Sequence, residues 1–211
     1  MYRKGLARGI VLVLLLMGQG VSVGSDDPSI ESVVVFNTQC ASCHEGECSG
    51  RMSFQLAEDA ADEHIRRYGG DMPLERVRDL GKLLRYMKER CAFFPLPLAL
   101  VADHSWGRDI LDRLRGPEGT AYFLPLGAVG AGHHLLRISG LDAGVRACAE
   151  LVAADFDLVD QDGLAPDGEH QVLRFRVQIP GELFLRLRAQ VPISLTRVEL
   201  VTWAAAETHP E

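Results

Sequence analysis

The spacing of apolar residues along the chain changes near residue 93. Before that point, apolar side chains recur every three or four positions, as they do in helices that pack by one face. After residue 118, short runs alternate apolar and polar residues between Gly, Pro and Asp turns, which is typical of antiparallel strands. The pattern therefore predicts two domains, a small all-α unit followed by an all-β antiparallel sandwich.

The first part is predicted to hold three helices. One opens at Asp27-Pro28, where a capping carboxylate precedes a proline at the first helical position. A second covers residues 54–68 and ends at Gly69-Gly70, and a third covers residues 73–91. Residues 93–117 contain several prolines and form a predicted junction with one short helix, from Ser105 to Leu114.

The second part, residues 118–205, contains six strand-like runs, and residues 206–211 form a tail. The runs are 121–124, 134–138, 147–152, 171–179, 182–190 and 193–203. Four arginines occupy polar positions of two alternating runs, and we expect them to form one basic stripe on a sheet face: Arg174, Arg176, Arg186 and Arg188.

The first 24 residues read as a secretory signal peptide. Three basic residues precede the apolar run from Ile10 to Met17, and small residues follow it. The run is short and is followed by Gly18 and Gly20, so an N-terminal membrane anchor is the weaker interpretation. We therefore expect a periplasmic or extracellular protein.

Cys40-Ala41-Ser42-Cys43-His44 is the most specific motif of the chain. Two thiols separated by two residues can each add to one vinyl group of a haem, and the histidine that follows can ligate the iron. A redox dithiol would need a surrounding βαβ pattern, and a zinc ribbon would need a second pair of ligands. The sequence shows neither, so the motif predicts one covalently bound haem c, held by Cys40 and Cys43, with His44 as an axial ligand.

Residues 28–91 resemble a small class I (monohaem) cytochrome c. The resemblance rests on Phe36 four residues before the motif, on Gly69-Gly70, on the Met72-Pro73 dipeptide and on the closing helix. It implies that Met72 is the second axial ligand of the iron and that the protein carries single electrons without being an enzyme itself.

The position of Met72 departs from the family pattern. It follows His44 by 28 residues, which is shorter than usual in that family. His64 is the main alternative sixth ligand, and a second imidazole would lower the reduction potential relative to a thioether. Met52 and an open sixth position are the remaining alternatives, and an open position would favour a haem sensor or a peroxidase-like protein.

The other three cysteines leave one pairing to consider. In an oxidising compartment, Cys48 and Cys91 could form a disulfide between the haem loop and the last helix, or both could be buried free thiols. Cys148 is expected in the core beside Ala147 and Ala149.

The net charge of the chain indicates which kinds of partner it can bind. The formal net charge is −7, and loss of the signal peptide, with three basic and no acidic residues, makes it −10. An acidic surface argues against nucleic acid as a partner and favours a redox protein with a basic docking face.

Residues 118–203 loosely resemble galactose-binding-like and carbohydrate-binding jelly-roll domains, without a shared motif. The β part could therefore dock a membrane complex, a polysaccharide or like subunits in a filament, with the haem merely carried along.

Overall fold

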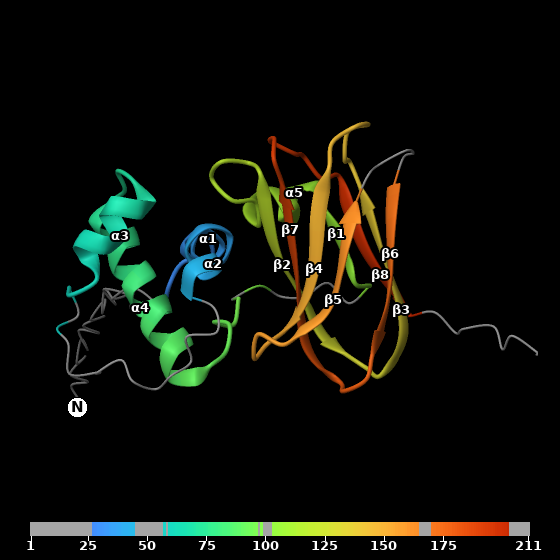
Figure 1. Cartoon of the computed structure of the whole chain (residues 1–211), viewed down its shortest axis with the longest axis horizontal. Coiled ribbons are helices and arrows are strands. Elements are labelled where there is room, and N and C mark those ends of the chain that lie inside the picture. Colours follow the sequence, from blue (N-terminus) through green and yellow to red (C-terminus); the bar gives the residue numbers. More distant parts are fainter. Residues whose placement is uncertain are drawn as a thin grey trace, which may run out of the picture.

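The computed structural model describes residues 27–44, 57, 59–96, 98, 103–164 and 170–202. Two antiparallel sheets of four strands each stack face to face, and the N-terminal helices lie against one of them (Figure 1). No helix within these described residues is both long enough and apolar enough to cross a membrane.

The two sheets are built from strands that are mostly far apart in sequence. Sheet A has the order β1-β8-β3-β6, with bounds Ser105–Gly107, Arg197–Thr202, Gly132–Ser139 and His170–Val177. Sheet B has the order β2-β7-β4-β5, with bounds Ala121–Val129, Gly181–Ala189, Ala147–Ala153 and Leu158–Leu164. Apart from the β4–β5 hairpin, consecutive strands alternate between the sheets, which is the wiring of a jelly roll.

The main core lies between the sheets. Alternate residues of each strand point inward, so Leu136 and Ile138 of β3 meet residues such as Leu151 of β4 and Leu185 of β7, all of which are fully buried. Tyr122 of β2 is also fully buried in this core. The alternation in the sequence therefore identified the inward faces of these strands.

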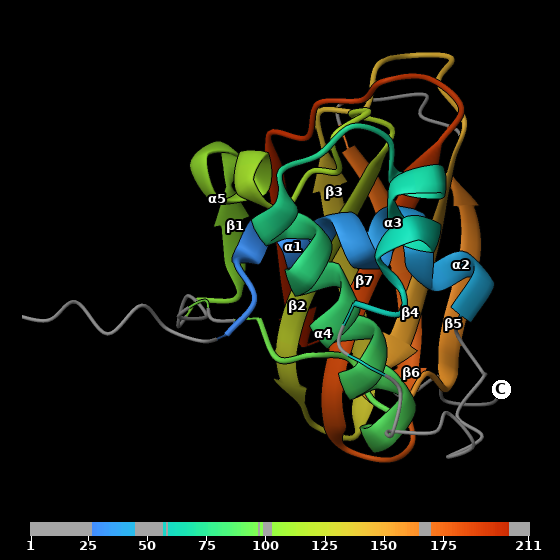
Figure 2. The ribbon, with the colours of Figure 1, turned by 90° about the vertical axis from the view of Figure 1, so that its left-hand side faces the viewer.

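The helices form a layer outside sheet B. Their bounds are α1 Ile30–Val35, the π-helix η1 Phe36–Cys40, α2 Ala41–His44, α3 Asp62–Gly69, α4 Leu74–Arg90 and, further along, α5 Arg108–Arg113. In Figures 1 and 2, α1 and α2 run across the strands of sheet B, and α3 and α4 lie on the outer side of α1 and α2. We call the segments from α1 to α4 the helical layer.

The expectation of an all-α cytochrome unit in residues 25–92 is wrong. Most elements of the described chain are strands of the two sheets, and every helix except α4 has eight residues or fewer. Val34 of α1 is buried in the core cluster of the sandwich, whereas its neighbours Val33 and Val35 pack within the helical layer. A helical period shows that a face is buried but not what buries it, so the sequence could not show that sheet B completes this layer.

The expected single basic stripe is also wrong. Arg174 and Arg176 lie on β6 in sheet A, whereas Arg186 and Arg188 lie on β7 in sheet B. The helical layer and the 93–96 segment cover the outer face of β7, so only 4% of Arg186 is exposed. Its guanidinium lies 3.4 Å from Glu150 and 5.9 Å from the centre of the Phe93 ring.

Smaller differences from the predictions concern single elements. The short helix expected over residues 105–114 is divided into β1 and α5, and β5 was not predicted because its exposed positions are mostly polar. Cys148 is half-buried on the outward side of β4, where the Gln161 amide nitrogen lies 3.3 Å from its sulfur, and not in the core.

Candidate haem-binding site

A single π-helical turn leads the chain into the thiol pair. In η1 the N–H of Ala41 donates to the carbonyl of Phe36, five residues earlier. The Asn37 amide donates to the carbonyl of Val33 at 2.9 Å, and the Thr38 hydroxyl donates to that of Val34 at 2.7 Å. These side chains satisfy carbonyls along an irregular helix. Such π-turns are frequent at functional sites.

The motif residues face a cavity of about 480 Å³ between η1–α2, α3 and α4. Cys40, Cys43 and His44 line it together, as the sequence predicts for a common site. Cys40 is half-buried and Cys43 is exposed. The volume lies within the usual range of about 300–1,000 Å³ for cofactor sites.

The opposite walls of the cavity are apolar. Ile65 comes from α3, and Leu80 and Leu84 come from α4; their exposed fractions are 7%, 1% and 7%. Phe36, which stands four residues before the motif, also lines the cavity and is 4% exposed. A large, flat, apolar ring system with a few polar attachment points fits this lining.

His64 of α3 faces His44 across the cavity. The centres of the two rings are 5.7 Å apart with their planes at 71°, and Tyr68, one helical turn further on, lies 4.8 Å from His64. The two rings are thus in edge-to-face contact, and both histidines line the cavity.

Met72 is close to the cavity but does not line it. Its side chain is 8% exposed and packs in the core of the helical layer. A Cβ added to Gly69, which does line the cavity, would collide with the Met72 methyl group. The predicted Met72 ligand therefore lies directly behind one wall of the site.

The environment of Cys40 favours the protonated thiol. Burial raises the pKa of Cys40 above the ordinary thiol value, and the neighbouring Cys43 raises it further. Burial and the neighbouring thiol thus both disfavour the thiolate form of Cys40.

Two residues that the sequence did not assign to the site line it as well. Tyr68 is 76% exposed at the open side of the cavity, and Gln39 lies beside the thiols, with its amide nitrogen 3.4 Å from Glu118. The four-residue spacing of His64 and Tyr68 could have indicated that both share one helix face. Gln39 carried no comparable signal.

Several predicted residues fall outside the described part of the chain. These are Cys48, Met52, the signal peptide and the tail. Cys91 ends α4 as a left-handed C-cap with φ 49°, and its disulfide with Cys48 stays a prediction.

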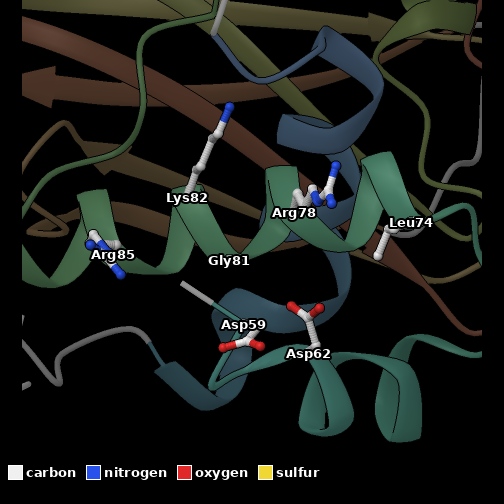
Figure 3. A pocket seen from close by; sticks show the side chains of 7 residues that line it. All are labelled: Asp59, Asp62, Leu74, Arg78, Gly81, Lys82 and Arg85. Carbon is white, nitrogen blue, oxygen red and sulfur yellow. The ribbon is translucent and has the colours of Figure 1, made fainter. Parts of the chain in front are cut away.

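A second hollow of about 470 Å³ lies beside α4 (Figure 3). Two carboxylates, Asp59 just before α3 and Asp62 at its first residue, lie beside α4. The helix contributes Arg78, Lys82 and Arg85 to the lining, and the side chains of Arg78 and Lys82 extend away from the two carboxylates. This hollow has no thiol or imidazole in its described lining, so it does not compete with the first cavity as the haem site.

Comparisons with known proteins place the chain in no family. No family model matches it, and no curated protein matches it. Among solved structures, it is similar to a protein described as a family GH115 4-O-methyl-α-glucuronidase with specificity for decorated arabinogalactans. The identity is 12%, the TM-score is 0.35, and the match covers 70% of this chain and 24% of that one. A likeness at this level says nothing of activity.

Proposed function

We propose that this chain is an exported c-type haem protein that carries single electrons and is not itself an enzyme. The observation that carries the proposal is the common cavity of Cys40, Cys43 and His44, with apolar walls opposite them. Covalent haem attached at this motif supplies one-electron exchange between ferric and ferrous iron.

The roles of the chain's own residues follow from their positions. Cys40 and Cys43 hold the haem through thioether bonds, and the ring of His44 ligates the iron. Ile65, Leu80 and Leu84 exclude water from the opposite face of the cavity, which favours electron transfer over binding of external ligands. The open side at Cys43 and Tyr68 is where a redox partner would approach, and the net negative charge of the chain favours a partner with a basic face.

Haem attachment can be tested in a host that matures c-type cytochromes. We expect the exported protein to keep its haem through acid–acetone extraction and to show a c-type pyridine haemochrome spectrum. Cys40→Ala with Cys43→Ala should abolish covalent haem. Cys148→Ala is the matched control, because this cysteine lies on β4 away from the cavity. Haem-free wild-type protein from such a host would overturn the proposal.

The sixth ligand decides between a carrier and a second candidate, a haem sensor or peroxidase-like protein. The second candidate is favoured by one observation, that Met72 does not line the cavity. The exposed His64 does line it and is the alternative protein ligand, which would keep the sixth position closed. A Met72 ligand predicts that Met72→Ala alone removes the ferric sulfur-to-iron charge-transfer band. A His64 ligand predicts instead that His64→Ala alone gives a high-spin spectrum that shifts with carbon monoxide. A wild-type protein that already binds carbon monoxide has an open position and is not a simple carrier.

A further inference from the structure

Sheet A presents an arginine-rich outer face. Because its inward residues are buried, the alternate residues of β3, β6 and β8 point outward. Strand register places four arginines on this side, and we call them the arginine face: Arg137, Arg174, Arg176 and Arg197.

The arginine face is only partly neutralised by its own residues. Glu199 is the one carboxylate among the outward residues of these described strands. It contacts Arg137 at 3.0 Å and Arg197 at 2.7 Å. Arg174 and Arg176 are both exposed, and neither forms an ion pair with any described residue. Two guanidinium groups are thus available to an external anion.

Charge is segregated across the molecule. The chain as a whole is acidic, with a net charge of −7, yet this face carries an excess of cations. The acidic residues gather elsewhere, and the β4–β5 hairpin, residues 147–164, contains five carboxylates and no lysine or arginine. A basic face on an acidic protein attracts an acidic partner to that one side.

The position of the arginine face separates it from the haem cavity. Sheet B lies between sheet A and the helical layer (Figure 1). A partner bound to the arginine face is therefore held on the opposite side of the sandwich from the proposed redox site. Such a contact would anchor the protein and leave the open side of the cavity accessible.

The chemistry of the face favours a polymer with repeated carboxylates. Guanidinium groups pair bidentately with carboxylates. Arginines two positions apart on a strand lie about 6.6 Å apart, and they form a flat, regular array suited to repeated carboxylates. We propose that the outer face of sheet A binds an acidic polysaccharide whose uronate carboxylates pair with Arg174 and Arg176.

The test uses the full-length protein and polygalacturonate as the probe, with neutral dextran beside it. We expect binding to polygalacturonate only, weakening with salt. Arg174→Gln with Arg176→Gln should lower the affinity about two- to thirtyfold, the effect of two exposed charge pairs. The matched control is Arg66→Gln with Arg67→Gln, which removes the same charge from exposed positions on α3. Thermal unfolding of both variants confirms that each is folded.

Three results would overturn the proposal. One is equal binding to dextran, and another is an equal loss of affinity in the α3 control, which would indicate general charge attraction. The third is a larger effect of the Arg174 and Arg176 changes on polyglutamate or duplex DNA than on polygalacturonate, which would assign the face to another polyanion. The haem spectrum is unaffected by these changes, so failure here leaves the proposed electron carrier untouched.

Discussion

At the scale of single residues, Tyr122 shows how the sandwich closes one of its ends. The side chain is fully buried, yet its hydroxyl accepts a hydrogen bond from the N–H of Leu195 at 3.1 Å. The same hydroxyl donates to the carbonyl of Ile193 at 3.4 Å. One side chain of β2 thereby holds the irregular segment that leads into β8, and it satisfies backbone groups that no strand pairs.

Tyr122→Phe should lower the free energy of unfolding by about 1–3 kcal/mol, because it leaves a buried N–H and a buried carbonyl without a partner. Urea denaturation monitored by circular dichroism measures this change. Tyr68→Phe is the control, since Tyr68 is 76% exposed and its hydroxyl should contribute almost nothing. Equal stability of the two variants would show that the Tyr122 hydroxyl is not needed.

The same hydroxyl gives a pH dependence with a defined sign. Burial raises the pKa of Tyr122 above 10, a shift that the hydrogen bond from Leu195 partly opposes. The folded state thus resists losing this proton, so stability is complete below pH 10 and falls as pH rises above it. Tyr122→Phe should lack this alkaline loss. The wild-type protein and the variant must be compared with Cys40 in the same form, either both attached to haem or both free. The pKa of a free Cys40 thiol is also raised, so its titration would add to the pH dependence.

At the scale of elements, the contact between the helical layer and sheet B depends on a cluster of phenylalanines. Phe93 lies three residues beyond the end of α4, and its ring is 5.2 Å from that of Phe123 on β2 and 5.0 Å from that of Phe184 on β7. Phe156 closes the cluster at 4.6 Å. The N–H of Phe93 also donates to the carbonyl of Ala154 at 2.8 Å. The end of α4 is therefore attached to the sheet by both its backbone and its side chain.

Phe93→Ala should cost about 3–5 kcal/mol of stability, the usual loss for a buried aromatic ring. The loss should be concentrated at the contact between the layers, so amide hydrogen exchange of α4 should accelerate more than that of β3. Leu158→Ala, at a position that is 58% exposed, is the control and should change neither value appreciably. Uniform acceleration in both elements would mean that the layers unfold as one unit.

At the scale of the whole molecule, the cavity at Cys40, Cys43 and His44 depends on a sheet that contributes none of its lining. The cavity is lined by the helical layer, but the other side of that layer rests on sheet B. Val34 of α1 belongs to the sandwich core, and a Cβ on Gly116 would meet the Thr38 side chain at 2.9 Å. The helices that carry the thiols are thus held in place from behind.

A fragment of residues 25–92 should therefore not fold cooperatively. Without sheet B it exposes Val34 and the underside of η1 to water, and the core left to it is the small cluster of the helical layer. Thermal unfolding followed by circular dichroism should give a broad, weak transition, whereas the full chain should unfold sharply. A sharp transition of the fragment at the temperature of the full chain would show that the helical layer is self-sufficient.

The sequence alone determined those features that depend on neighbours along the chain. Strand-like runs located most strands, and alternation identified the inward faces of β6 and β7, because side chains of a strand point to opposite sides in turn. The three- and four-residue period located α4 within one residue at each end. The spacing of Cys40, Cys43 and His44 put three candidate ligands on one short segment, and these three residues do line one cavity.

Only the tertiary structure decided what covers each face. A buried face looks the same in sequence whether a helix or a sheet covers it, so the pattern could not reveal that Val34 packs in the sandwich core or that Arg186 is buried at 4% exposure. Likewise, β6 and β7 follow one another along the chain but lie in different sheets, which separates Arg174 and Arg176 from Arg186 and Arg188. Sheet membership is set by contacts between distant strands, and no local pattern records those contacts.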